Sequence, residues 1–409
     1  MTEHGEAGVQ QPLSIERLPV SEDRDTAYAM IRERGPVTSV TTGVAAISRE
    51  TVEYVLRHPE LFSSKRAYES AGSPVPMLPI AFDPPEHTRY RRLLQPHFSP
   101  RRIRAMEPEI RALAVRLVGE VADAGRCDFV SSIAVPLPAQ VFLTMFGLPL
   151  ADRDRLIAWK DAILGSAPEF GAEAPSEAAA KAGGELFGYL VEHIAARRAE
   201  GGGNDLLAVL LADTSGDRLT EHELLGMCFQ FVLAGLDTVT DALSNAFAIL
   251  ATRPDLRRQL VDDPDVIPDA VEELLRIDGP ILTLPRVAVE DVRLGGHQVT
   301  AGSAVHVAVA VADRDPSEHA EPDTIDFRRR QPHLAFGIGP HFCLGAHLAR
   351  LEMKAVLEEW HRRIPSYRLA EGVRPAALWP AGLVGVAGLP LVYPADGTCV
   401  SRDGRAGSR

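Results

Sequence analysis

Lysine is scarce in this chain, and the overall charge is strongly negative. Only four lysines occur, so arginine supplies nearly all of the 43 basic residues, which stand against 56 acidic ones. The formal net charge is −13. A surplus of negative charge disfavours binding to a polyanion, so we expect no nucleic acid among the partners.

Cysteine is also rare, with four residues in 409. Four unevenly spaced cysteines in so long a chain do not form a disulfide framework. Free thiols fit a reducing compartment, and we therefore expect a cytoplasmic protein. Cys127, Cys228 and Cys399 are expected to be ordinary buried thiols.

The first eleven residues lack the basic and apolar segments of a signal peptide, so we expect no membrane anchor. The apolar run 224–250 is long enough to cross a bilayer. We nevertheless expect a core helix there, because polar side chains interrupt the run at Gln230, Asp237, Asp241 and Asn245.

Hydrophobic periodicity predicts a mainly α fold with a smaller β region. Helices are expected at residues 24–35, 50–59, 86–96, 100–122, 136–146, 151–164, 178–199, 205–213, 221–251, 253–261 and 265–277. Strands are expected near 37–47, 294–299, 304–311 and 383–393. We expect one catalytic domain over 21–394, between a flexible segment 1–20 and a disordered tail 395–409. The irregular stretches 65–81 and 164–184 are either surface loops or lids over a pocket.

One cysteine stands out by its surroundings. Residues 336–345 read Phe-Gly-Ile-Gly-Pro-His-Phe-Cys-Leu-Gly, which places Cys343 in a glycine-rich loop before a helical pattern starting at Ala346. Glycine permits a positive φ and close approach of the backbone to a bulky flat group. The positive end of the following helix is expected to lower the pKa of the thiol. A thiolate is one of the proximal ligands of haem iron.

This loop resembles the haem-binding segment of the cytochrome P450 family, with the pattern F-G-x-G-x-H-x-C-x-G filled at every fixed position. The resemblance implies haem b with Cys343 as its proximal thiolate and metal ligand. Phe336, Gly337, His341 and Gly345 would surround it. It also implies the cytochrome P450 fold, in which a long central helix lies over the haem.

A second signal lies within the longest helical run, where Ala234-Gly235-Leu236-Asp237-Thr238 places weak helix formers and an acid among apolar residues. A buried acid and hydroxyl must be hydrogen-bonded or functional. An ordinary helix kink is the alternative. A break there would free carbonyls for the Thr238 hydroxyl. The segment resembles the A-G-x-D-T motif of the same family, which implies that Thr238 steadies dioxygen and that Asp237 relays protons.

Residues 83–92 read Asp-Pro-Pro-Glu-His-Thr-Arg-Tyr-Arg-Arg. His87 and Arg91 lie four residues apart, so on a helix both could donate to one carboxylate. The segment resembles the family's D-P-P-E-H-T-R-x-R-R sequence, in which the histidine and arginine clamp a haem propionate. Arg286 and His341 match the other propionate donors. A solvated surface charge is the alternative for each arginine taken alone.

Glu273 and Arg276 are spaced i, i+3 and can pair on one helix face. A surface pair is the default interpretation. The family resemblance implies instead a buried structural pair joined by a further arginine, for which Arg329 is the candidate.

The resemblance implies a haem-thiolate monooxygenase that inserts one oxygen atom from O2 into a lipophilic small molecule, in natural-product biosynthesis or catabolism. No reductase segment follows, so electrons from NAD(P)H would arrive through ferredoxin reductase and ferredoxin. The docking patch would be an arginine cluster at positions 89, 92, 101, 102 and 104, which could equally be a solvated face. We expect a monomer. Candidate pocket residues, placed by analogy, are Met77, Leu78, Phe231, Val232, Leu282, Leu284, Leu383 and Val384.

Two alternatives stay open. One is a peroxide-driven peroxygenase, although such members typically lack the acid–alcohol pair present at 237 and 238. The other is a haem-binding sensor or carrier without turnover.

Overall fold

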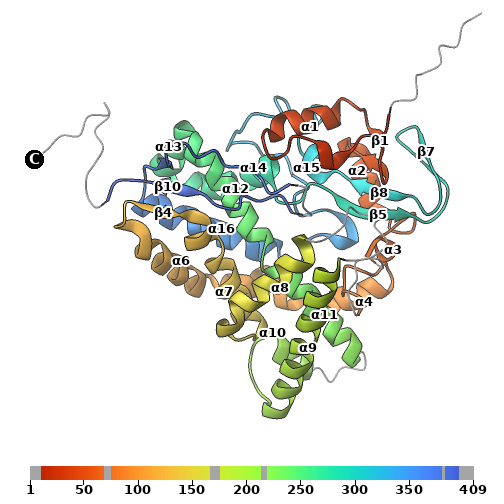
Figure 1. Ribbon diagram of the computed structural model, residues 1–409, viewed down its shortest axis with the longest axis horizontal. Coiled ribbons are helices and arrows are strands. Elements are labelled where there is room, and N and C mark those ends of the chain that lie inside the picture. Colours follow the sequence, from red (N-terminus) through yellow and green to blue (C-terminus); the bar gives the residue numbers. More distant parts are fainter. Residues whose placement is uncertain (1–10, 69–74, 166–175, 213–218, 380–382, 396–409) are drawn as a thin grey trace, which may run out of the picture.

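The protein is mainly helical with a smaller β region (Figure 1). The computed structural model describes residues 11–68, 75–165, 176–212, 219–379 and 383–395. Most of the two terminal segments, the middle parts of the two expected lids, and Cys399 lie outside these ranges.

The helices follow the predicted order closely. They are α1 Arg24–Arg32, α2 Arg49–Arg57, α3 Ser64–Tyr68, α4 Glu86–Leu94, α5 Pro100–Ala105, α6 Glu107–Ala122, α7 Pro136–Phe146, α8 Arg153–Gly165, α9 Glu177–Glu200, α10 Leu206–Ala212, α11 Glu221–Gly235, α12 Thr238–Thr252, α13 Pro254–Asp262, α14 Ile267–Asp278, α15 Val309–Ala312 and α16 Ala346–Arg363.

Several helices start at a side chain that caps the first turn. Asp23, Ser48, Ser176 and Thr220 each accept a hydrogen bond from a backbone N–H three residues on. Such caps satisfy donors that would otherwise have no partner. At α11 the cap is reciprocal, because the Glu223 side chain accepts from the Thr220 N–H.

The strands form one larger sheet and two small ones. The larger sheet has the order β1 (Val37–Val40), β2 (Gly43–Ala46), β8 (Ala304–Val307), β5 (Leu284–Ala288) and β3 (Phe62–Ser63). β4 (Arg126–Asp128), β10 (Pro390–Val392) and β9 (Arg368–Leu369) make a second sheet, and β6 (Val292–Leu294) pairs with β7 (His297–Val299). In Figure 1 the larger sheet lies with α1 and α2 at one side of the molecule, beside the helical part.

Three strand predictions and one helix prediction need correction. Residues 294–299 form a hairpin instead of one strand, because Gly295 and Gly296 take positive φ values of 52° and 86°. The run 304–311 is a strand only to Val307, after which the chain turns into α15. Only the end of 383–393 is a strand. Helix 100–122 is two helices, with a new first turn containing Pro108.

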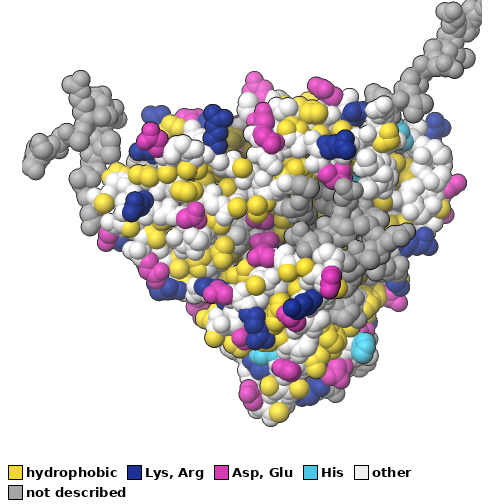
Figure 2. Space-filling model, viewed as in Figure 1, with side chains coloured by type: hydrophobic (Ala, Val, Ile, Leu, Met, Phe, Trp, Pro, Cys, Tyr) yellow, Lys and Arg dark blue, Asp and Glu magenta, His cyan; other side chains and the backbone are white. Residues whose placement is uncertain are grey.

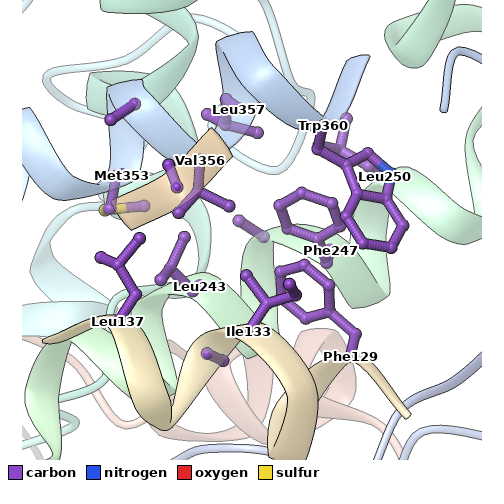
Figure 3. Packing of buried hydrophobic residues seen from close by; sticks show 14 of the residues in the cluster. Phe129, Ile133, Leu137, Leu243, Phe247, Leu250, Met353, Val356, Leu357 and Trp360 are labelled. Carbon is purple, nitrogen blue, oxygen red and sulfur yellow. The ribbon is translucent and has the colours of Figure 1, made fainter. Parts of the chain in front are cut away.

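The main hydrophobic core joins α12, α16 and the segment leading into α7 (Figure 3). Trp360 is fully buried, and its ring packs edge-on against Phe129 and Phe247 at centroid distances of 5.2 and 5.4 Å. Edge-to-face aromatic pairs add stability beyond the area they bury. These rings fix α16 against α12.

The run Glu221–Thr252 is long and apolar enough to cross a membrane by length and composition alone. Within the protein, however, 61% of its most apolar window is buried, and the run is two helices with a break at Leu236 and Asp237. The expectation of a core helix is therefore met by two consecutive ones.

Candidate active site

Helix α4 presents His87 and Arg91 from one face. His87 is 2% exposed, and its ring lies 4.1 Å, centroid to centroid, from that of His341 in the cysteine loop. Arg286 projects from β5 and is 4% exposed. Three segments far apart in the sequence thus bring two guanidinium groups and two imidazoles into one buried region.

These groups lack partners to an unusual degree. Nε2 of His87, Nε of Arg91 and Nε2 of His341 are buried and have no hydrogen-bond partner among the described residues. The nearby carboxylate of Asp83 accepts instead from Ser63 Oγ and Ser64 N. Buried polar groups are nearly always paired, so three unpaired donors in one place indicate a missing anionic ligand.

The protonation states agree with that conclusion. Burial, with the charge of Arg91, lowers the pKa of His87 to about 4. Burial, with Arg286 and His87, lowers the pKa of His341 to about 2. Both imidazoles are therefore neutral at pH 7, while the two guanidinium groups carry the positive charge of the region.

The cysteine loop is folded by its own backbone bonds and by glycine. The N–H of Cys343 donates to the carbonyl of Phe336 over 2.8 Å. Gly337 and Gly339 take positive φ values of 65° and 73°. At Gly339 a Cβ would also lie 2.6 Å from the carbonyl oxygen of Leu56, so this position admits only glycine without a shift of α2.

The pKa of the Cys343 thiol is raised, which corrects the expectation that the following helix lowers it. Part of the Cys343 side chain is accessible to solvent, but protein atoms surround it closely, and the resulting loss of solvation determines its pKa. Burial raises the pKa, and it outweighs the hydrogen bonds from the N–H groups of Gly345 and Ala346 and the charges of Arg91 and Arg350. The helix N-terminus acts in the expected direction, but it is the weaker effect.

The break between α11 and α12 lies at the predicted position. Asp237 leaves the helical conformation, and the Thr238 hydroxyl donates to the Ala234 carbonyl over 3.3 Å. Ala234 is exposed, whereas a Cβ on Gly235 would lie 2.4 Å from the Phe142 ring of α7. The close packing of α11 against Phe142 thus requires glycine at position 235, and Ala234 is the small residue on the exposed side of α11.

Lys160 is a functional candidate that sequence reasoning missed. It lies on α8, is 2% exposed, and pairs with Asp237 over 2.8 Å and with Asp161 over 2.6 Å. Burial alone would lower the pKa of Lys160, but the two carboxylates raise it, so the lysine is charged. Its signal in the sequence was its rarity, one of four lysines, directly after an apolar stretch.

The structure brings Glu273, Arg276 and Arg329 together. Arg276 donates to both carboxylate oxygens of Glu273, over 2.7 and 2.9 Å, and the Arg329 Nε donates to the same carboxylate over 3.1 Å. Glu273 and Arg276 are 3% and 1% exposed. The pair is therefore buried and not on the surface.

Two predicted pocket residues lie on α11 just before Ala234. Val232 is fully buried within a hydrophobic cluster. It lies on the opposite side of α11 from Ala234, because residues two positions apart on a helix point in nearly opposite directions. The ring of Phe231 stacks on that of Phe98 at 5.7 Å. Gln230, four residues before Ala234, shares its face.

The other pocket candidates divide by burial. Met77 and Leu78 are buried in the cluster that includes α11, and Leu78 touches the helix at Gly226. Leu284 and Leu383 are partly exposed. Leu282 and Val384 are buried together in the cluster formed with the N-terminal helix.

Comparison with known proteins decides the family. Residues 176–362 match the family model described as Cytochrome P450. The chain is 39% identical to mycinamicin IV hydroxylase/epoxidase of Micromonospora griseorubida, over 77% of this chain and 79% of that protein. The chain belongs to the cytochrome P450 family.

Other relatives of this cytochrome P450 agree. It is 36% identical to the vitamin D(3) 25-hydroxylase of Pseudonocardia autotrophica, over 85% of this chain and 88% of that one. The structure of a mutant of P450 EryK in complex with erythromycin B superposes with a TM-score of 0.83, at 31% identity, over 90% of this chain and 95% of that one. The chain is thus a haem-thiolate monooxygenase that uses redox partners and acts on lipophilic compounds, as the family does.

The residues present fit a haem group. Its two propionates would supply the anions that His87, Arg91, Arg286 and His341 lack. The accessible thiol of Cys343 lies in the loop that contacts this cluster.

Proposed function

We propose that this cytochrome P450 binds haem b through Cys343 and oxygenates a lipophilic natural product. The unpaired donors of His87, Arg91 and His341 support the proposal most directly, because three buried donors beside two guanidinium groups fit the carboxylates of haem. When bound, haem supplies the activation of dioxygen and the oxygen transfer.

The protein's own contribution is to bind, orient and deliver protons. Arg286 and Arg91 offer permanent positive charge, and the two neutral imidazoles can donate without adding charge. We assign to Asp237 the transfer of a proton to the neighbouring Thr238 hydroxyl, which its own bond to the Ala234 carbonyl orients. Lys160 holds the Asp237 carboxylate in position.

Substitution of the cysteines tests the haem assignment. Cys343→Ser should abolish the red-shifted ferrous–CO absorption band that marks a thiolate-bound haem. Cys228→Ser is the matched control, since Cys228 is a fully buried thiol on α11, outside the loop 336–345, and its replacement should leave the band intact. Retention of the band in Cys343→Ser would refute the ligand assignment.

We further propose that a ferredoxin, reduced by its reductase, docks where α5, α14 and α16 meet. A groove of about 240 Å³ is lined there by Arg104, His347, Arg350 and Lys354 and also by Glu107 and Glu272, and Glu272 pairs with Arg350 over 2.6 Å. Phe342, next to Cys343, is 39% exposed. Arg89 from the predicted cluster faces elsewhere, since it pairs with Glu223 of α11 over 2.5 Å.

Charge reversal tests this docking surface. Arg104→Glu should slow electron transfer from an acidic ferredoxin and weaken the dependence of that rate on salt. Arg116→Glu is the control, because Arg116 lies on α6 outside the groove. Equal effects of both substitutions would reject the groove as the docking site. On the face drawn in Figure 2, acidic and basic side chains are likewise interspersed.

The substrate class is proposed from relatives and from the apolar candidates near α11. The names of the relatives describe oxidation of mycinamicin IV and of vitamin D(3). A screen of macrolides and sterols for a shift of the ferric haem from low to high spin would identify ligands. If neither class gave a shift, the proposed substrate class would be wrong. A cytoplasmic location is likewise our proposal.

A further inference from the structure

Asp241 is a second acid close to Asp237: it lies in the first turn of α12, and Asp237 is the residue that precedes this helix. Its N–H donates to the Asp237 carbonyl over 2.9 Å, so the two residues are one helical turn apart. Residues spaced i, i+4 share a helix face. Asp241 is 7% exposed.

The loop 383–386 holds the Asp241 carboxyl in place. A Cβ on Gly385 would lie 1.7 Å from Asp241 Oδ1 and 2.3 Å from its Cγ, so only glycine allows this approach. Ser244 lies beside this contact without bonding the carboxyl: its hydroxyl donates to the Asp241 backbone carbonyl over 2.9 Å and accepts from Val386 N over 3.2 Å. The carboxyl therefore has a defined position against a backbone that must pass close by.

The cations that face Asp241 are already engaged elsewhere. Lys160 of α8 is bound by Asp237 and Asp161, and Arg24 of α1 is bound by Asp278 over 2.6 Å. The groups that bear on Asp241 are therefore two cations with carboxylate partners and the two acids Asp237 and Asp161.

These surroundings keep a proton on Asp241. Burial and the Asp237 carboxylate raise its pKa to about 8, more than Lys160 and Arg24 lower it. At neutral pH Asp241 then keeps its proton, one turn from the Asp237 side chain that Lys160 binds. A carboxyl with a pKa near the working pH is suited to give up and regain a proton.

We propose that Asp241 supplies protons to Asp237, and through it to Thr238. The O–H bond of the Asp241 carboxyl breaks, a carboxylate oxygen of Asp237 takes the proton, and the Asp241 carboxylate is reprotonated from solvent. No oxidant or reductant is needed. Asp241 acts through Asp237, so it is a positioning residue in the proton supply and does not touch the reacting atoms. The proposal rests on the proposed role of Asp237.

Infrared spectroscopy of the purified holoprotein tests the protonation state without turnover. The spectrum of the wild type minus that of Asp241→Asn should show a protonated-carboxyl absorption at pH 7 that disappears as the pH rises through about 8. Glu352, whose pKa burial also raises to about 8, is present in both proteins and cancels in the difference. Ser244→Ala is the matched control, since it loosens the same turn without removing a titratable group, and it should keep the absorption. A difference spectrum that lacks this absorption overturns the proposal.

Turnover with a substrate found by the spin-state screen tests the proton supply. Asp241→Asn should release at least about tenfold more peroxide per NAD(P)H consumed than the wild type at pH 7, and the difference should vanish above pH 8. In a double-variant cycle, adding Asp241→Asn to Asp237→Asn should not increase the peroxide released per NAD(P)H any further, because the two groups act in series. Ser244→Ala should behave as the wild type.

The outcomes separate the two proposals. If Asp241→Asn loses the infrared absorption but keeps wild-type peroxide release at every pH, the carboxyl only fills space beside Gly385 and the proposal falls. Loss of the thiolate-haem band in the wild type would instead refute the proposed function. If Asp241→Asn fails to fold, the smaller Asp241→Ala takes its place in both measurements.

Discussion

Replacing Arg276 with methionine removes a guanidinium group that joins α14 to the segment 313–326. The group is 1% exposed and donates to both carboxylate oxygens of Glu273. It also donates to the carbonyls of Asp313, Pro322 and Thr324 over 2.9, 2.8 and 3.0 Å. Methionine fills a similar volume but makes none of these bonds.

The expected cost follows from what is left behind. Removing one partner of a buried ion pair costs about 3–5 kcal/mol. The buried Asp313 carbonyl, left without its donor, adds about 1 kcal/mol, whereas Pro322 and Thr324 are open enough for water to replace the donor. The total of roughly 4–6 kcal/mol is a large share of the ~5–15 kcal/mol by which domains are usually stable. We therefore expect Arg276→Met to be partly unfolded at 25 °C and to retain little haem.

Arg329→Met is the matched control for the same carboxylate. Its single bond to Glu273 is longer, at 3.1 Å, and its contacts with carbonyl groups are 3.2 to 3.4 Å. Because Arg276 would still neutralise Glu273, we expect a loss of about 1–2 kcal/mol. Urea denaturation followed by circular dichroism measures both variants. If Arg276→Met lay within about 1 kcal/mol of the wild type, or if Arg329→Met cost as much, the reasoning would be refuted.

Two further predictions concern α11. Burial alone would raise the pKa of Glu223, but the bonds from Arg89 and the capping N–H hold it at about 2, below its ordinary 4.5. This group stabilises the fold above pH 4.5, and the stabilisation is lost as the pH falls toward 2. Lowering the pH from 4.5 toward 2 should therefore reduce the free energy of unfolding of the wild type by about 1–2 kcal/mol more than that of Glu223→Gln, after allowance for solvent screening. If the free energies of unfolding of the two proteins fell in parallel with pH, this prediction would be contradicted. Gly226→Ala should lower the free energy of unfolding by about 1–3 kcal/mol, because its Cβ would lie 2.1 Å from the Pro76 carbonyl oxygen. A Cβ on Gly188 of α9 would meet no atom within 4 Å, so Gly188→Ala should be neutral or slightly stabilising. Thermal melts of both variants measure the difference.

Long helices and the cysteine loop could be predicted because their signals are local. Each capped helix start has a serine, threonine or aspartate before an apolar period, and the loop has glycines where the backbone needs positive φ. The break at Asp237 was also local, since weak helix formers stood in an apolar run.

The missed features depend on partners that are distant in sequence. β5 contains Pro285 and was not predicted as a strand, yet it pairs with β8 and β3. Residues 309–312 have the composition of a strand but fold as α15 against α2. The roles of Lys160 and Asp241 could not be predicted from the sequence, because they depend on contacts between α8, α12 and the loop at Gly385.

The larger sheet and α1 determine the order in which the chain can complete its fold. β2 pairs in parallel with β8, so that Val44 meets Val305. Arg24 of α1 reaches Asn245, 221 residues further on, as well as Asp278. During synthesis the first segments to leave the ribosome must wait for these late partners, because contacts between distant residues form slowly. The N-terminal helix and β2 therefore cannot complete their packing before α12, α14 and β8 have been synthesised, and until then β2 offers an exposed edge to other chains.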